Sequence, residues 1–443
     1  MKWRTSAVAD AVGGTLSGPD VEISGATVDS RAMAGGELFV AVRAARDGHR
    51  FIGDALAAGA AASLSAEPGV PGTSVVVDDT VVALAALGRA CRSRLENAPL
   101  IGVTGSAGKT STKDLLAAAL DGPFRPAASE RSFNNELGVP LTLLNAPDDA
   151  DVVVVEMGAR GPGHIAVLCD IARPTVGVVT NVGLAHAETL GSAEGVARAK
   201  AELVESLPPS GTAVLNADDG RVSAMRSVSA AEVLTFGVDG GDVRATGLVL
   251  DDELRTAFLL DTPWGSADVR LSVRGAHHAA NAAAAAAAAL AVGAPLDAVA
   301  DGLGRARLSP WRMDLCRSAD GGLVLNDAYN ANPASTEAAL RSLAALSARR
   351  RVAVLGPMFE LGEHSEAEHH RIGALARALG IDLVIAVGAP EYGGDDVDDI
   401  AAAVGLVGPV TAGDAVLVKG SRAAGLERLA SVLCGSVERM AAW

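Results

Sequence analysis

The sequence predicts an α/β protein with mostly parallel sheets, divided into several domains. The chain has 443 residues, which is too long for one hydrophobic core and favours two to four domains. Short Val- and Ile-rich runs end in Gly or a polar residue and alternate with helix-like segments, as expected of buried parallel strands. In addition, a glycine-containing loop joins one of these strands directly to a helix.

The first region, up to about residue 80, mixes short strands with one helix. Apolar runs over 36–42 and 73–77 predict strands, and residues 51–62 predict a helix. This pattern indicates a small α/β domain. A second helix over 81–96 leads from it to the strand that precedes the glycine loop.

The central region continues with buried strands, and a further alternation of strands and helices follows it. Valine-rich runs over 152–158 and 176–183 predict strands, and the Ala-rich run 282–294 predicts a buried helix, too short to span a bilayer. Beyond residue 310 come apolar stretches separated by helical patterns, at 322–330, 352–358, 383–388 and 414–421. They predict a smaller doubly wound domain. We place the domains at 1–82, 83–309 and 310–443.

The composition narrows the possible partners. The net charge is -16, from 53 acidic and 37 basic residues, which argues against a nucleic-acid or anionic-membrane surface. The first residues contain no apolar signal segment. The cysteines, Cys91, Cys169, Cys316 and Cys434, form no CxxC pair. We therefore expect reduced thiols, each a small core residue, in a cytoplasmic protein.

Residues 101–112, IGVTGSAGKTST, have the pattern of a phosphate-binding loop. A strand stops at Gly105, and a helix follows in which Leu115, Leu116 and Leu120 share one face. Backbone N–H groups and the positive end of that helix would cradle phosphates. The candidate residues of the loop are Gly105, Ser106, Gly108, Lys109, Thr110 and Ser111.

Within this loop, Lys109 would supply a positive charge and Thr110 a hydroxyl for Mg²⁺, so the expected ligand is a nucleoside triphosphate. The longer form of the pattern places a Gly five positions before Gly108, where this chain has Val103. The loop is therefore a shortened form, and an ordinary strand-to-helix turn is the alternative.

Two polar residues after the central strands are candidates for metal binding, whereas a lysine in the helical stretch that follows them is not. Glu156 closes a valine-rich strand and is either a ligand or a solvated strand tip. His186 follows the next strand and could bind a metal or simply cap a loop. Lys200 lies in a helical stretch, where residue statistics favour a solvated side chain.

Taken together, several segments closely resemble the Mur ligases of peptidoglycan synthesis. They are TGSAGKTSTK, SFNNELGVPLTLL, the stretch from EMGARGPGH through GVARAKAEL, NADD, NDAYNANPAS and VLVKGSR. The resemblance covers nearly the whole chain in order, and the N-terminal region includes the DSR motif with Ser30 and Arg31. Within the family, it is strongest to the ligases that act on UDP-N-acetylmuramoyl-tripeptide.

The resemblance implies three domains: a small α/β domain that binds UDP, a central P-loop ATPase domain with a mostly parallel sheet, and a Rossmann-like C-terminal domain. It also implies a reaction in which ATP phosphorylates the carboxylate of UDP-N-acetylmuramoyl-tripeptide and D-alanyl-D-alanine displaces phosphate. Mg²⁺ is the implied cofactor. We expect a monomer that binds neither nucleic acid nor membrane.

Carried over residue by residue, the resemblance assigns metal and substrate roles. Lys109 matches the lysine on the β- and γ-phosphates, and Thr110 and Glu156 match ligands of a first Mg²⁺. His186 and Lys200 match a second metal site, in which the lysine is carbamoylated and so becomes anionic. Asn134 and Asn135 match the acyl-acceptor site, and Ser30 and Arg31 the uridine-nucleotide site.

The resemblance also assigns the nucleotide contacts. Asn281 matches an adenine-side asparagine, Arg312 a phosphate-contacting arginine and Asp327 a ribose-binding aspartate. ATP would then lie between two domains, and domain closure would complete its site. The alternatives are that Asn281 caps the Ala-rich helix and that Arg312 only fixes the linker.

Two departures from the family pattern bear on specificity. His278 stands where the family usually has Asn, and Pro357 stands where an acidic residue is common, near the region that receives the dipeptide. Rival functions are the ligase that forms the tripeptide, a related ligase of secondary metabolism and folylpolyglutamate synthase. A nucleotide-binding module without turnover is a further alternative.

Overall fold

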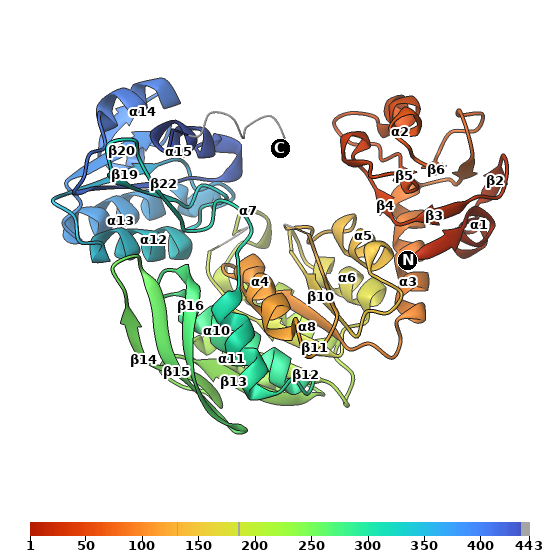
Figure 1. Cartoon of the computed structure of the whole chain (residues 1–443), viewed down its shortest axis with the longest axis horizontal. Coiled ribbons are helices and arrows are strands. Elements are labelled where there is room, and N and C mark those ends of the chain that lie inside the picture. The colour runs from red at the N-terminus through yellow and green to blue at the C-terminus, as the bar shows by residue number, and fades with distance from the viewer. Residues whose placement is uncertain (131, 185–186, 436–443) are drawn as a thin grey trace.

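The computed structural model describes residues 1–130, 132–184 and 187–435. The chain forms three parts in sequence order, with the N-terminal part (red) and the C-terminal part (blue) both adjoining the central part (Figure 1). Among the described residues, none of the helices is both long and apolar enough to cross a bilayer. The α/β class with mostly parallel sheets, predicted above, is confirmed.

The N-terminal part contains two small sheets. One is the antiparallel pair β1 (Lys2–Arg4) and β3 (Glu22–Ser24). The other has the order β2-β7-β6-β5-β4 and is parallel except at β2. Its strands and the two helices of this part are β2 (Thr15–Ser17), β4 (Ala26–Thr27), β5 (Leu38–Val40), β6 (Ala62–Ser65), β7 (Ser74–Val76), α1 (Thr5–Val12) and α2 (Ile52–Ala57).

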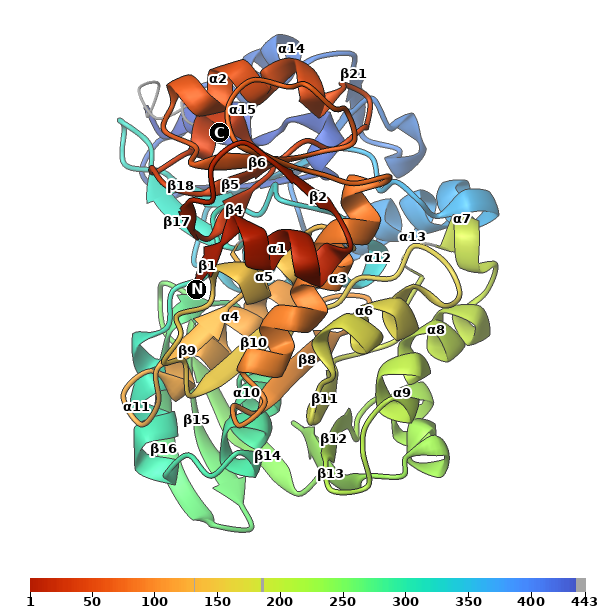
Figure 2. The same cartoon turned by 90° about the vertical axis from the view of Figure 1, so that its right-hand side faces the viewer.

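Helix α3 (Thr80–Arg94) connects this part to the central one (Figure 2). It begins where the Asp79 carboxylate accepts hydrogen bonds from two backbone N–H groups of the first turn. It packs against α5 (Gly138–Asn145) and α6 (His164–Ala172). The side-chain amide of Asn145 also bonds the backbone N–H and carbonyl of Ala26 at 2.8 and 2.9 Å, which ties the two parts together.

The central part is built on a nine-stranded sheet with the order β16-β15-β14-β13-β12-β11-β8-β10-β9. The pairs from β9 to β14 are parallel, whereas β15 runs antiparallel to its neighbours. The strands are β8 (Leu100–Thr104), β9 (Pro126–Ala128), β10 (Val152–Glu156), β11 (Val176–Val179), β12 (Thr212–Asn216), β13 (Glu232–Gly237), β14 (Val243–Leu250), β15 (Arg255–Thr262) and β16 (Gly265–Arg274).

The strand order places the glycine loop at a binding position. Strand β8 lies between β10 and β11, so later strands of the sheet are added on both sides of it. In open parallel sheets, ligands bind outside the carboxyl ends of the strands at such a reversal point. The loop after β8 and the polar residues that end β10 and β11 therefore meet at one edge of the sheet.

Helices cover both faces of this sheet, which explains the uninterrupted valines of β10. Val152 and Val154 pack with α4 (Lys109–Leu120), α10 (His278–Ala291) and α11 (Leu296–Arg305). Val153 and Val155 pack on the opposite face with α3, α5, α6 and α8 (Ala193–Glu205). The alanines of α10 are buried, as predicted. Two short helices, α7 (Ala187–Leu190) and α9 (Gly220–Ala224), complete this part.

The C-terminal part is a smaller doubly wound domain. Its six-stranded sheet has the order β17-β18-β22-β19-β20-β21 and is parallel except at β17. Its elements are β17 (Asp314–Arg317), β18 (Leu323–Asn326), α12 (Pro333–Ala345), β19 (Arg350–Leu355), α13 (Ser365–Ala378), β20 (Leu383–Val387), β21 (Asp395–Val397), α14 (Ile400–Val407), β22 (Asp414–Lys419) and α15 (Glu427–Leu433).

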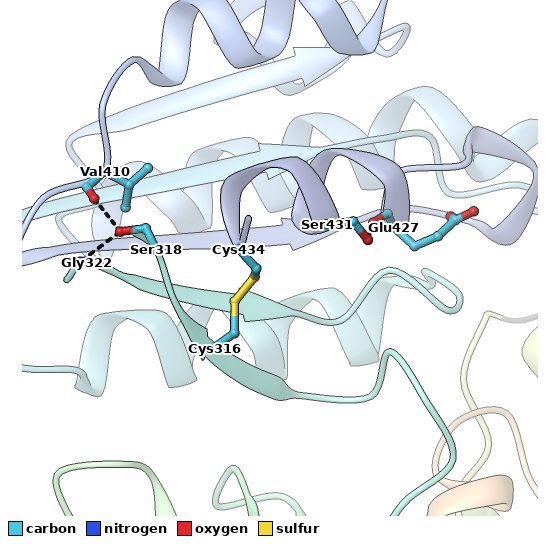
Figure 3. Close-up of a disulfide and its surroundings, with 7 residues drawn as sticks. All are labelled: Cys316, Ser318, Gly322, Val410, Glu427, Ser431 and Cys434. Carbon is cyan, nitrogen blue, oxygen red and sulfur yellow. Dashed lines mark hydrogen bonds between the residues drawn. A yellow bond between two sulfur atoms is a disulfide. The ribbon is translucent and has the colours of Figure 1, made fainter. Parts of the chain in front are cut away.

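The cysteine prediction is half wrong. Cys316 of β17 and Cys434, which follows α15, form a disulfide although 118 positions separate them (Figure 3). Spacing along the chain could not indicate this pairing, because the fold brings the end of α15 beside β17. Cys91 and Cys169 are free and buried as expected, and burial raises the pKa of both thiols to about 12.

Candidate active site

A cavity of about 900 Å³ lies between the central and C-terminal parts and has walls from both. Most of the residues predicted from the sequence line it: Ser106, Gly108, Lys109, Thr110, Ser111, Asn134, Asn135, Glu156, Asn281, Arg312 and Asp327. The fold therefore brings together, around one volume, segments that lie more than 200 positions apart in the sequence.

The two glycines of the loop are required by its geometry. Gly105 has φ +151°, and a Cβ there would lie 1.8 Å from Thr180 Oγ1. Gly108 has φ +80° and precedes α4, and a Cβ there would lie 2.5 Å from Asn281 Oδ1. Only glycine fits both positions. The backbone of the loop can therefore approach a ligand closely.

Residues after β11 hold the loop in place, and sequence reasoning gave them no role. Asn181 accepts from Ser106 N through its carbonyl (3.0 Å) and from Ala107 N through its side chain (2.8 Å). Thr180 Oγ1 donates to the Ala107 carbonyl at 2.6 Å. Lys109 Nζ folds back onto the Gly105 carbonyl at 2.8 Å. Burial lowers the pKa of this lysine, against the opposing charge of Glu156.

Glu156 is buried, with 1% of its surface exposed, so it is not a solvated strand tip. Its Oε2 accepts from Thr110 Oγ1 at 2.7 Å, and its Oε1 accepts from Asn134 Nδ2 at 2.8 Å. Arg312 Nη2 donates to Thr110 Oγ1 at 2.9 Å, and its guanidinium lies over the Tyr329 ring. A hydroxyl, a carboxylate and a positive group thus meet at the mouth of the phosphate loop.

Lys200 lies on the inner side of α8 with 1% of its surface exposed. In the described part of the chain, no hydrogen bond or ion pair involves its amine. Burial, and then the charge of Lys109, lower its pKa well below the ordinary value for lysine. The solvated helix lysine that residue statistics favoured is therefore wrong.

The wall contributed by the C-terminal part contains an ion pair that sequence reasoning missed. Lys419 Nζ, at the end of β22, contacts Asp327 Oδ2 at 2.5 Å and is buried. Asn332 Nδ2 reaches across to the Ser106 carbonyl at 3.3 Å. Because strands β18 and β22 are adjacent, polar residues after both had to meet, and this was a usable signal.

Asn281 and the neighbouring histidines form the floor of the cavity beside Gly108. The Asn281 side chain lies 3.1 Å from His278 Nδ1, and the rings of His277 and His278 are 4.1 Å apart. Burial lowers the pKa of His277 to about 4 and lowers the pKa of His278 well below its ordinary value, so both rings are neutral at pH 7. Asn281 thus lies against the loop at Gly108 and does not cap α10, whose N-cap residue is His277.

Four of the predicted residues that the structure describes do not line this cavity: Ser30, Arg31, Gly105 and Lys200. Ser30 and Arg31 lie in a short 3₁₀ turn of the N-terminal part, where the exposed Arg31 guanidinium pairs with Asp29 at 2.7 Å. His186 lies outside the described residues. Gly105 stabilises the loop from outside the cavity lining, since its carbonyl accepts a hydrogen bond from Lys109.

The fold and this cavity define a nucleotide-dependent enzyme with a phosphate loop whose site is completed by a second, doubly wound domain. Comparison with known families agrees with this class. The description "Mur ligase middle domain" matches residues 103–289, "Mur ligase, glutamate ligase domain" matches 311–430, and "Mur ligase family, catalytic domain" matches 22–98. The chain belongs to the Mur ligase family.

Individual relatives cover nearly all of the chain. It is 41% identical to the UDP-N-acetylmuramoyl-tripeptide–D-alanyl-D-alanine ligase of Mycobacterium tuberculosis, with 92% of each chain covered. It is 37% identical to the Escherichia coli enzyme of the same name, with 97% of each covered. Among solved structures, it is similar to MurF from Acinetobacter baumannii, with a TM-score of 0.88, 31% identity and coverage of 98% and 99%.

Another similar structure is MurF ligase from Thermotoga maritima in complex with ADP, with a TM-score of 0.79 and 30% identity, covering 94% of this chain and 98% of that one. A folylpolyglutamate synthase from Mycobacterium tuberculosis matches with a TM-score of 0.64 but only 20% identity. That likeness shows a shared fold alone.

Proposed function

We propose that this protein is an ATP-dependent ligase that joins D-alanyl-D-alanine to UDP-N-acetylmuramoyl-tripeptide. The observation that carries the proposal is the single cavity in which a glycine phosphate loop, the buried pair Thr110–Glu156 and two asparagines face a second domain. Relatives named UDP-N-acetylmuramoyl-tripeptide–D-alanyl-D-alanine ligase, at 37–41% identity over more than nine-tenths of the chain, support the same reaction.

The chemistry requires activation of a carboxylate, which is a poor electrophile. The carboxylate oxygen attacks the γ-phosphorus of ATP, ADP leaves, and an acyl phosphate forms. The neutral amine of D-alanyl-D-alanine then attacks the carbonyl carbon. Inorganic phosphate leaves with the former carboxylate oxygen, the amine loses its proton, and an amide remains.

The cavity residues suit the first half of this reaction. The backbone N–H groups of the loop and the start of α4 favour phosphate oxygens. Lys109 and Arg312 bring positive charge to the position where the transferred phosphoryl group carries negative charge. Asp327 and Asn281 would bind the nucleoside from opposite parts of the protein.

Thr110 and Glu156 fit a magnesium ion, because a hydroxyl and a carboxylate oxygen are ligands that Mg²⁺ prefers. Their oxygens already lie 2.7 Å apart, and the Thr110 hydroxyl also contacts Arg312 and Ser132. When bound, Mg²⁺ would supply positive charge that offsets the repulsion between phosphate and carboxylate. Asn134 would keep Glu156 oriented through its own hydrogen bond.

For Lys200 we propose carbamoylation, which the family resemblance implies. The supporting observation is an amine that is buried, has no partner in the described part of the chain and lies close enough to Lys109 to feel its charge. A neutral amine attacks CO₂, a C–N bond forms, and one proton is released, which leaves a carboxylate at the lysine tip. That carboxylate, with His186, would be suited to hold a second Mg²⁺.

The N-terminal part would bind the UDP end of the substrate through Ser30 and Arg31. Arg31 is exposed and positively charged, as a contact to a diphosphate requires. This role makes the substrate bridge the N-terminal and central parts. We propose the divisions 1–82, 83–309 and 310–443 as functional units and a monomer as the working form.

A product assay tests the proposal. The protein is incubated with ATP, Mg²⁺ and UDP-N-acetylmuramoyl-tripeptide, with and without D-alanyl-D-alanine. We expect phosphate release only in the complete mixture, and a UDP-linked product whose mass has grown by one dipeptide less water. Phosphate release without the dipeptide, or a product formed with another amine in its place, would count against the proposal.

A further inference from the structure

The loop that follows β19, residues 356–361, forms part of the cavity wall contributed by the C-terminal part. Phe359 and Glu360 line the cavity, and Phe359 is 49% exposed although it is apolar. Glu360 has a left-handed backbone, with φ +65°, and its charge opposes the burial that lowers the pKa of Lys109. A non-glycine residue keeps such a backbone only where the surrounding structure holds it. The loop therefore depends on contacts from other segments.

His369 of α13 contacts this loop from the protein interior, and only 3% of its surface is exposed. Its Nε2 lies 2.9 Å from the backbone nitrogen of Met358, and its Nδ1 lies 2.6 Å from the carbonyl oxygen of Ser365. The amide can only donate and the carbonyl can only accept, so both bonds form when the ring carries its proton on Nδ1. The imidazole thus accepts a hydrogen bond from the residue directly before Phe359.

Two further side chains hold neighbouring backbone groups of the loop. The ring of Tyr392, which is fully buried, packs against the ring of His369 with their centroids 4.8 Å apart. The Tyr392 hydroxyl donates to the Gly356 carbonyl at 3.0 Å. Ser421, which follows β22, accepts through its Oγ from the Phe359 N–H at 3.0 Å. Ser421 itself lines the cavity, whereas His369 and Tyr392 act from outside its lining.

The place of the loop in the cavity indicates which of the three proposed substrates depends on it. The nucleotide is assigned above to the phosphate loop, and the UDP-tripeptide to the wall with Asn134 and Asn135. The remaining wall presents the Glu360 carboxylate, the Arg422 guanidinium and the Phe359 ring to the same volume. An acid, a base and an apolar ring together suit a zwitterionic dipeptide with small apolar side chains.

We propose that His369 is a positioning residue for the binding of D-alanyl-D-alanine. It acts through the Met358 N–H and so keeps Phe359 and Glu360 in place at the cavity wall. Met358 is itself buried, and removal of the imidazole acceptor would leave its N–H without a partner. A buried donor without a partner is costly, which favours a shift of the loop. This inference rests on the proposed function and adds a residue that touches no substrate.

Two substitutions of His369 separate the acceptor from the rest of the ring. Glutamine can place its amide oxygen near the position of Nε2, whereas asparagine is too short to do so. We expect His369→Asn to raise the KM for D-alanyl-D-alanine about tenfold, with kcat and the other two KM values changed less than about threefold. His369→Gln should keep the dipeptide KM within about threefold of the native value. His370→Asn is the matched control, because His370 contacts the Glu366 carbonyl in the same way, at 2.9 Å, but is exposed and outside the cavity lining.

Tyr392→Phe is an independent variant that keeps the ring packing and removes the donor to Gly356. It should raise the dipeptide KM about three- to fivefold, and its result decides the matter if His369→Asn shows no melting transition. An unchanged dipeptide KM in the folded variant that is used would overturn the inference. So would equal losses in His369→Asn and His369→Gln, a loss shared by all three substrates, or the same loss in His370→Asn.

Failure of the proposed function has a different signature from failure of this inference. The native protein would then form no dipeptide-extended product from UDP-N-acetylmuramoyl-tripeptide, and both proposals would fall.

Discussion

Lys200 lies on the same side of α8 as Val196, Leu203 and Val204, all of which are buried. Glu194 and Arg198 occupy the exposed side. This spacing is the i, i+4 pattern of a buried helix face, so its burial could have been predicted from the sequence. What the sequence could not show is that Lys109, ninety-one positions earlier, contributes to the electrostatics around the amine.

If Lys200 acts as a carbamate, its role depends on an anionic tip and not on the positive charge of lysine. Lys200→Ala should therefore lose most activity, on the order of 10²-fold or more, and Lys200→Arg should not restore it. Formate or acetate should recover part of the activity of the alanine variant by filling the vacated anionic position. Rates with and without carboxylate are compared at matched ionic strength, which removes general screening.

Full activity of Lys200→Arg, or of Lys200→Ala without added carboxylate, would refute the carbamate. The arginine variant distinguishes a carbamoylated lysine from a lysine that acts through its positive charge. A lysine of the second kind should tolerate replacement by arginine.

Gly108 combines a left-handed backbone with contact to Asn281. Gly108→Ala should strain the loop by about 1–2 kcal/mol and push Asn281 away, so the KM for ATP should rise roughly tenfold. The KM for the UDP-tripeptide should hardly change. Gly69→Ala is the control, since Gly69 has a similar φ of +73° but open space around it. An unchanged KM for ATP in Gly108→Ala would show that the loop does not hold the nucleotide.

At the scale of elements, hydrophobic patterning predicted the central strands of the two larger sheets, but it did not predict β9, β12 to β16, β17 or β21. The valines of β10 and the apolar runs of β8, β11, β19 and β22 are all buried strands. The glycine loop and Glu156 could be located because strand ends are marked by the change from apolar to polar residues. The polar residues at the ends of β18 and β22 carried the same signal, but their pairing as Asp327–Lys419 depends on which strands the fold places side by side.

The disulfide between Cys316 of β17 and Cys434 after α15 provides a direct test of how these two elements are placed. Alkylation of the unfolded, unreduced protein should modify two thiols, Cys91 and Cys169, and reduction should expose two more. Closing a loop of this length stabilises a fold by at most about 5 kcal/mol, so the reduced protein should melt at a lower temperature. Four reactive thiols before reduction would show that Cys316 and Cys434 are not bonded in the purified protein.

At the scale of the whole molecule, the central and C-terminal parts meet through polar contacts around the cavity. Arg312 bonds Thr110, Asn332 bonds the Ser106 carbonyl, and the Glu188 N–H donates to the Glu360 carbonyl at 3.2 Å. Each of these contacts is made by residues that line the nucleotide cavity or adjoin it. Binding of ATP and closure of the two parts should therefore be coupled, because the nucleotide touches the same groups.

The central claim is that this cavity drives amide formation through an acyl phosphate. The most direct measurement uses UDP-N-acetylmuramoyl-tripeptide with ¹⁸O in its terminal carboxylate, together with ATP and D-alanyl-D-alanine. We predict that each turnover yields ADP and one inorganic phosphate that carries a single ¹⁸O, since the carboxylate oxygen leaves with the phosphoryl group. Unlabelled phosphate, or ¹⁸O recovered in AMP, would contradict the account.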